Sequence, residues 1–207
     1  MNQILYFKKN NMKYKIQFII SIVIFTISII ILFINIYKAH KNETISNKLM
    51  SSYSVTTLYS NSLNEDTINL DTEETEPFVI GIIKIDKINL NYPILSSISN
   101  DLLDISVCRF AGPMPNKIGN LCIAGHNYVD YKLFSRVNEL KKDDTIEIYD
   151  LDGQKIEYSI YDIYETNADD TSCTFQDTNG NRIVTLITCN NVNGKRLIVH
   201  AKEIPRT

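Results

Sequence analysis

Cys189 and Arg196 are the two residues whose types and spacing most clearly suggest reaction chemistry. Cys189 closes a β-type run over residues 182–188, and Arg196 opens a second run over residues 196–201. The Asn- and Gly-rich residues 190–194 between the runs are typical of a turn. Such a hairpin places a thiol beside a guanidinium. A fixed positive charge favours the thiolate, so the pair predicts a nucleophilic site.

A histidine base would complete this site, and the chain has three histidines, His40, His126 and His200. His40 lies beside an apolar N-terminal segment, far in sequence from the β-rich body. His200 lies within the last β-type run, where we expect a half-exposed structural residue. His126 follows a glycine after the short apolar run 121–124, at a strand end where loops build functional sites. We therefore predict that His126 is the catalytic histidine.

Cysteine and histidine together suit acyl transfer. The imidazole can stabilise the thiolate and then donate a proton to the leaving amine. The developing oxyanion needs positive charge or N–H donors, and arginine can supply these but cannot act as a base. We expect Cys189 to be the nucleophile, His126 the acid and base, and Arg196 an oxyanion or substrate clamp. Thr188, next to the cysteine, is a weaker candidate for lining the substrate site.

Short Ile- and Val-rich runs separated by Gly, Pro and Asn turns fill the chain after Pro77. This pattern predicts a mainly β fold of seven or eight strands, a closed or nearly closed barrel with few helices. Residues 130–140 have the apolar spacing of a short helix, and residues 166–181 read as a polar loop. The strands are expected at 79–85, 88–95, 121–124, 145–149, 155–164, 182–188 and 196–201.

The N-terminal part reads as a membrane anchor. Residues 16–37 are almost purely apolar and would span roughly 33 Å as a helix, close to the thickness of a bilayer core. Basic residues 1–15 precede them, which predicts a cytoplasmic N-terminus. A cleaved signal peptide is the alternative, but no small-residue cleavage site follows. Residues 38–76 then form a polar extracellular tether, and residues 77–207 the catalytic β-barrel.

Charge and cysteine usage exclude several classes of function. Residues 1–41 hold six Lys and no acidic residue, so the remainder carries 15 basic and 24 acidic residues, a net charge of −9. An acidic body argues against nucleic acid as a partner. The cysteines show neither C-x-x-C nor zinc-ligand spacing, residues 150–153 lack the spacing of a calcium loop, and we expect no metal or cofactor. Four cysteines outside the membrane could form two disulfides, although Cys122 and Cys108 read as buried thiols and Cys173 as a loop residue.

These residues also carry a resemblance to a known family. Thr185-Leu186-Ile187-Thr188-Cys189 with Arg196 resembles the TLxTC…R signature of sortases, and Gly119-Asn120 with Ile123-Ala124-Gly125-His126 resembles their GN…IAGH segment. The anchor, tether and β-rich body occur in the same order as in that family. The resemblance covers residues 78–203 and implies the closed eight-stranded sortase β-barrel, preceded by one transmembrane helix.

The resemblance further implies a cysteine transpeptidase on the surface of a Gram-positive bacterium. Such an enzyme cleaves an LPxTG-like sorting signal of a secreted protein through a thioacyl intermediate. It then joins that protein to an amine of a peptidoglycan precursor or of a pilin. The segment between the strand that ends near Tyr164 and the strand near Val184 holds no long helical insertion, which argues against class B, and we expect a class D-like enzyme. A surface cysteine peptidase, a pilin-polymerising transpeptidase and an inert adhesion module remain alternatives.

Overall fold

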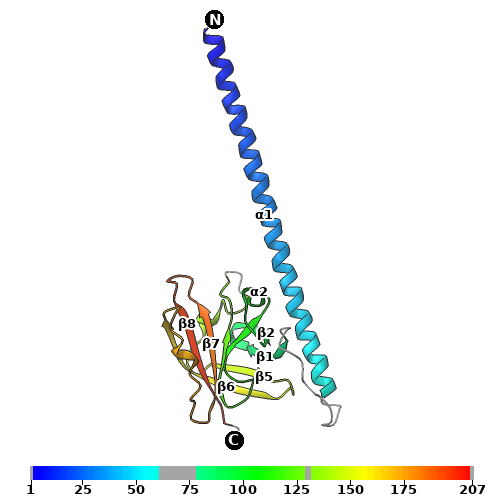
Figure 1. The fold of residues 1–207 in the computed structure, drawn as a ribbon, viewed down its shortest axis with the longest axis vertical. Coiled ribbons are helices and arrows are strands. Elements are labelled where there is room, and N and C mark those ends of the chain that lie inside the picture. Colours follow the sequence, from blue (N-terminus) through cyan, green and yellow to red (C-terminus); the bar gives the residue numbers. More distant parts are fainter. Residues whose placement is uncertain (1, 61–77, 129–131, 206–207) are drawn as a thin grey trace. The chain divides into compact units, whose positions relative to one another are not determined.

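The protein consists of one long helix followed by a β-barrel (Figure 1). The computed structural model describes residues 2–60, 78–128 and 132–205. The chain divides into two compact units, Met1–Thr44 and Ile45–Thr207. The helices are α1 (Asn2–Ser60) and α2 (Asn100–Leu103), with short 3₁₀ turns at Asp86–Ile88, Val137–Glu139 and Ser172–Thr174. The strands are β1 (Val79–Ile85), β2 (Leu90–Leu95), β3 (Val107–Ala111), β4 (Gly119–Ala124), β5 (Thr145–Tyr149), β6 (Lys155–Thr166), β7 (Arg182–Cys189) and β8 (Arg196–Glu203).

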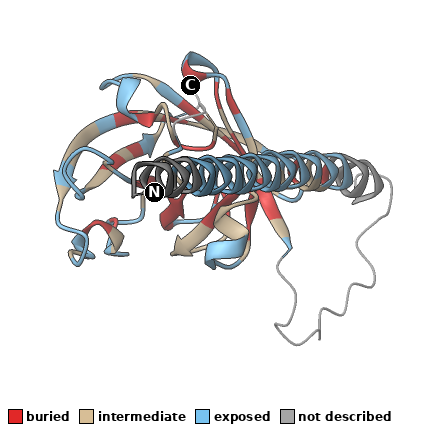
Figure 2. Cartoon of the chain, turned by 90° about the horizontal axis from the view of Figure 1, so that it is seen from above, coloured by how far each residue is buried: buried red, intermediate tan, exposed pale blue. Residues whose placement is uncertain are grey.

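Helix α1 presents an apolar surface along much of its length. Residues 14–37 are all exposed, and most of them are Ile, Leu, Val or Phe, as the exposed colour of the helix in Figure 2 shows. In the part of the chain that the structure describes, this helix is the single one long and apolar enough to cross a membrane. It continues to Ser60 through part of the expected tether, because no Gly or Pro interrupts it. Residues 61–77 lie outside the described residues.

The barrel closes in the order β1-β2-β3-β4-β7-β8-β6-β5, with β1 pairing back onto β5. Most neighbours are antiparallel, but β4 and β7 are parallel, as are β2 and β3. Successive side chains of a strand point to opposite faces, and those that point inward fill the barrel. The interior holds large aliphatic side chains such as Ile83, Ile123, Ile148 and Leu186, all fully buried. The expected closed, eight-stranded, mainly β fold is confirmed.

The helix predicted over residues 130–140 is wrong. Residues 129–131 lie outside the described residues, and only Val137–Glu139 forms a 3₁₀ turn. Leu133 has a left-handed backbone (φ 50°) and makes an isolated antiparallel bridge to Asn127. A left-handed residue of this kind is incompatible with a continuing right-handed helix. The apolar spacing reflects burial instead, since the side chains of this segment pack into the barrel core.

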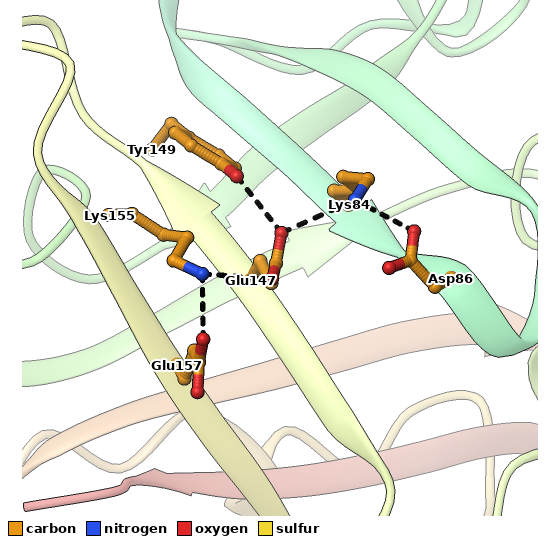
Figure 3. A network of polar contacts seen from close by, with 6 residues as sticks. All are labelled: Lys84, Asp86, Glu147, Tyr149, Lys155 and Glu157. Atoms are coloured by element: carbon orange, nitrogen blue, oxygen red, sulfur yellow. Dashed lines mark hydrogen bonds and ion pairs between the residues drawn. The ribbon is translucent and has the colours of Figure 1, made fainter.

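A ladder of charges crosses the outer face of β1, β5 and β6 (Figure 3). Glu147 lies at its centre, where one carboxylate oxygen is 3.1 Å from the Lys155 ammonium and the other is 3.6 Å from that of Lys84. Exposed pairs like these contribute about 0–1 kcal/mol each, so the ladder supports strand register more than stability. Its members are Lys84, Asp86, Glu147, Tyr149, Lys155 and Glu157.

Candidate active site

Cys189 and Arg196 face each other at the turn end of the β7–β8 hairpin. The two residues are direct partners in the antiparallel register. The turn between them is closed by backbone hydrogen bonds from Asn190 N–H to the Lys195 carbonyl (2.7 Å) and from Gly194 N–H to the Asn190 carbonyl (3.0 Å). Cys189 is exposed and Arg196 is half-buried. The hairpin thus places a solvent-accessible thiol beside a guanidinium, as the turn chemistry predicts.

The parallel pairing of β4 with β7 brings His126 to the same place. Ala124 is opposite Ile187 in the register, and Gly125 N–H donates to the Ile187 carbonyl at 3.1 Å. One residue beyond the histidine, Asn127 Nδ2 donates to the Cys189 carbonyl at 2.8 Å. His126 therefore lies between two residues that are both hydrogen-bonded to the end of β7. Strand β4 and strand β7 end side by side, with the imidazole and the thiol at adjacent ends.

Phe134 and Gly125 hold the backbone of the histidine loop. Phe134 N–H donates to the His126 carbonyl at 3.0 Å, and the fully buried phenyl ring lies against Gly125. A Cβ added at Gly125 would lie 2.7 Å from that ring, closer than carbon atoms can approach. Close packing against Phe134 therefore requires a glycine before the histidine. Through Phe134 the segment after β4 also holds the backbone of the histidine loop in place.

Thr188 joins the cysteine strand to the histidine loop. Its Oγ1 donates to the Gly125 carbonyl at 2.7 Å, and its side chain is only 3% exposed. The hydroxyl is therefore engaged inside the barrel wall. Through this hydrogen bond Thr188 links the backbone next to Cys189 to the backbone next to His126.

The other three cysteines are buried free thiols, so the four cysteines form no disulfide. Burial raises the pKa of the Cys108 thiol to about 12. Burial likewise raises the pKa of the Cys122 thiol to about 12. Burial also raises the pKa of Cys173, and the nearby Asp170 carboxylate adds to this effect. These thiols stay protonated and enclosed at neutral pH, which leaves Cys189 as the exposed cysteine of the chain.

His200 lies apart from this constellation. In the register it is paired with Thr185, four residues from the Cys189–Arg196 pair, a separation of about 13 Å along the strand. Its Nδ1 is 2.8 Å from the Thr185 hydroxyl, and its Nε2 is 3.2 Å from the Tyr164 hydroxyl. Burial lowers the pKa of His200, which keeps the imidazole neutral within this network. The expectation of a half-buried structural residue agrees with these contacts.

Asp104 approaches His126 and was not foreseen from the sequence. Its Oδ1 is 3.7 Å from His126 Nε2, and it accepts a hydrogen bond of 2.5 Å from the Tyr128 hydroxyl. The rings of Tyr128 and His126 are also in contact, with centroids 5.1 Å apart. A carboxylate in this position can orient the imidazole. No local pattern marks Asp104, because it comes from the turn after α2, on the far side of β3.

Asn120, part of the GN motif, anchors the loop between β6 and β7. Its Nδ2 donates to the carbonyls of Cys173 (2.9 Å) and Phe175 (3.2 Å), and it is only 3% exposed. Gln176 completes the contact by exchanging two hydrogen bonds with the Asn120 backbone, at 3.1 and 2.9 Å. The same loop starts at Thr166, which is paired with Arg196 in the β6–β8 register. Asn120 thus fixes a loop that begins beside the guanidinium.

Within the described residues, no group of three or more His, Cys, Asp or Glu side chains is arranged to hold a metal ion. The site brings together an exposed thiol, an imidazole at the end of the adjacent strand β4 and a guanidinium on the neighbouring strand β8. The same three groups at the ends of β4, β7 and β8 are expected of sortases. A model of the sortase domain matches residues 83–204. The chain belongs to the sortase family.

Individual sortases resemble it to different extents. Sortase A of Bacillus anthracis is 35% identical over 125 residues, which cover 58% of this chain and 58% of that protein. The chain therefore matches little more than half the length of this relative. Among solved structures, a Clostridium perfringens sortase D5 transpeptidase has a TM-score of 0.62 at 25% identity, covering 80% of this chain and 99% of that chain.

A second structure shows the fold again. Clostridium perfringens sortase C, solved with the C-terminal cell wall sorting motif, has a TM-score of 0.57 at 22% identity and covers 77% of this chain and 89% of that chain. The expected sortase membership is confirmed, and the likeness to a sortase D5 is compatible with a class D-like enzyme. The β6–β7 segment of this sortase holds one 3₁₀ turn and no long helix, as the sequence predicts.

Proposed function

We propose that this sortase is a cysteine transpeptidase in which Cys189 is the nucleophile, His126 the general acid and base, and Arg196 the clamp for the oxyanion. The observation that carries the proposal is the position of Cys189: its thiol is exposed, Arg196 is its cross-strand partner, and Asn127 ties it to the histidine loop. Asp104, whose Oδ1 is 3.7 Å from His126 Nε2, serves to orient the imidazole. Thr188 serves by positioning these groups, because its hydroxyl is already bonded to Gly125.

The reaction proceeds by two acyl transfers. The Cys189 thiolate attacks a peptide carbonyl, and the guanidinium of Arg196 stabilises the oxyanion. A C–S bond forms and the C–N bond breaks, while His126 gives its proton to the leaving amine. A second amine then attacks the thioester. The C–S bond breaks, a C–N bond forms, and His126 takes the proton of the attacking nitrogen, which restores the thiolate and imidazolium.

The substrate that fits this proposal is a secreted protein with a C-terminal LPxTG-like sorting signal, cleaved between Thr and Gly. The family resemblance supports it, as does the structure of a related sortase with a cell wall sorting motif. The acceptor is an amine of a peptidoglycan precursor or of a pilin subunit. The chain needs no cofactor in this mechanism.

We further propose that residues 16–37 anchor the enzyme in the cell membrane, with residues 1–15 cytoplasmic. Residues 38–76 then lead to an extracellular catalytic domain, residues 77–207. The continuous exposure of apolar side chains along residues 14–37 supports the anchor, because so large an apolar surface is unfavourable in water. Since Ile45–Thr207 forms a compact unit of its own, removal of residues 1–41 should yield a soluble and active domain. A truncated protein that folds only in detergent would contradict this.

The central experiment offers the full-length protein in detergent a library of LPxTG-like peptides, with and without an amine. Intact-mass spectrometry should detect a thioacyl adduct that maps to Cys189, and the amide product should form only when the amine is present. A product that is purely hydrolytic at saturating amine would assign the protein to the surface cysteine peptidases instead. Failure to form an adduct on Cys189 with any member of the library would refute the assignment of the nucleophile.

A further inference from the structure

A cavity of about 400 Å³ opens onto Cys189 from the side of β6 and β8. Neither His126 nor Arg196 lines it. The cavity therefore approaches Cys189 from a side without the two groups assigned to the first acyl transfer. Its wall is built by the end of β6, the start of β8, the β7–β8 turn and the segment that follows the histidine loop. The residues of that wall used below are Ile163, Glu165, Leu197 and Asn138.

Glu165 gives the cavity a fixed negative charge. Its Oε2 accepts a hydrogen bond from Asn193 Nδ2 at 2.8 Å, and its Oε1 accepts one from Asn190 Nδ2. These two hydrogen bonds, that of Asn193 foremost, lower the pKa of Glu165, so the carboxylate is ionised at neutral pH. Among the described residues it has no salt bridge. Each carboxylate oxygen can accept a second hydrogen bond, which leaves capacity for a cationic ligand.

We propose that this cavity binds the acceptor amine, as a primary alkyl ammonium, while the acyl group is held on Cys189. An ammonium donates three hydrogen bonds, and the Glu165 carboxylate and the side-chain carbonyl of Asn138 offer acceptors for it. The half-buried side chains of Ile163 and Leu197 give the methylene stem of a lysine-like amine an apolar surface. The cavity therefore favours an amine on an alkyl chain over the α-amine of a glycine peptide.

The resolving step is balanced within this arrangement. The bound ammonium releases one proton to solvent and attacks as the free amine. A C–N bond forms, the C–S bond to Cys189 breaks, and His126 accepts the second nitrogen proton. The thiolate and the imidazolium are then ready for the next cycle. This inference rests on the proposed transpeptidase function and adds to it the location and the chemical class of the second substrate.

The test compares a charged and an uncharged acceptor on the full-length enzyme in detergent. Nα-acetyl-lysine amide carries an ammonium at neutral pH, whereas hydroxylamine is uncharged. Glu165→Gln should raise KM for the lysine amide about two- to five-fold, the range for an exposed ion pair. It should leave KM for hydroxylamine and the rate of thioacyl formation unchanged. High salt should raise the wild-type KM for the lysine amide and have little effect on the variant.

A control variant completes the design. Asp169→Asn removes the same charge from an exposed carboxylate four residues away that does not line the cavity, and it should behave as wild type.

The outcomes separate the two proposals. Suppose that thioacyl-enzyme forms normally but Glu165→Gln and Asp169→Asn have the same KM for the lysine amide, or that Glu165→Gln raises KM equally for both acceptors. Either result overturns the amine site and leaves the transpeptidase function standing. A glycine amide acceptor that outcompetes the lysine amide would overturn the preference for an alkyl stem. If the wild-type enzyme forms no thioacyl adduct at all, the proposed function fails, and this inference fails with it.

Discussion

A Thr188→Val substitution should isolate the hydrogen bond that ties the cysteine strand to the histidine loop. Valine has nearly the same shape as threonine, so the change removes a hydroxyl without opening a cavity. The lost bond is short (2.7 Å) and buried, and its acceptor, the carbonyl of buried Gly125, loses that donor. A loss of this kind costs about 1–3 kcal/mol. For a domain of this size that corresponds to a fall in Tm of about 3–15 °C.

The effect on catalysis should exceed the effect on stability. Gly125 immediately precedes His126, so a relaxed Gly125 carbonyl lets the imidazole move relative to Cys189. A misplacement of about 1 Å can cost on the order of 10²-fold in rate. We expect the rate of thioacyl formation to fall about 10- to 100-fold on that basis. Thr188→Ser keeps the hydroxyl and should retain most of the activity.

Thr185→Val is the matched control. Thr185 lies on the same strand, is fully buried, and makes equally short contacts to Asn120 Oδ1 (2.7 Å) and His200 Nδ1 (2.8 Å). It should lower Tm at least as much as Thr188→Val while leaving thioacyl formation close to wild type. Both variants are assayed by thermal unfolding and by intact-mass kinetics. If the two lower the rate equally, or if Thr188→Val loses stability but no activity, the proposed positioning role of Thr188 is refuted.

Cys189→Ala should abolish transpeptidation and leave Tm nearly unchanged, because the residue is exposed at a strand end; residual turnover above background would contradict its role as nucleophile. His126→Ala should lose about 10²–10⁴-fold in kcat/KM, whereas His200→Ala should stay active, and the reverse ranking would exchange their roles. Arg196→Lys should be impaired nearly as much as Arg196→Ala, since a lysine lacks the planar fork; near-wild-type kcat/KM for the lysine variant would reduce Arg196 to a generic charge. Hydrogen bonds, that of the Thr166 hydroxyl first, lower the pKa of Asp170 to about 2, so its contribution to stability is present above pH 4 and lost as pH falls toward 2; Asp170→Asn should flatten the acid limb of Tm against pH between those values, and an unchanged limb would rule this out.

The fold could be predicted from the sequence because its signals are local. Runs rich in Ile and Val mark strands such as β1 and β7, and Asp152-Gly153 is a turn signal between β5 and β6. The absence of Gly and Pro before residue 77 allows the long α1. Periodicity failed over residues 130–140. There the apolar spacing matches a helix, but contacts with the histidine loop and a left-handed Leu133 decide the conformation.

The roles of Cys189, His126 and Arg196 remain predictions. Their positions show which part of the site depends on local sequence and which part depends on the tertiary fold. Cys189 and Arg196 are joined by a short turn, so local chemistry alone brings them together. His126 is 63 residues from the cysteine and reaches it through the parallel register of β4 and β7, which the resemblance implies and composition does not. Asp104 comes from the turn between α2 and β3, and no sequence pattern points to it.

The sequence by itself determined which residue types lie at strand ends, which side chains are apolar enough to be buried, and which N-terminal segment is too apolar for water. Only the tertiary structure decided what those strand ends face. The engagement of Thr188 with Gly125, the contact of Asp104 with His126, and the cavity that joins Glu165 to Cys189 all depend on elements distant in the chain. The physical reason is that periodicity and turn chemistry act over a few residues. Hydrogen bonds between segments form only after barrel closure fixes the register of strands that are not neighbours in sequence.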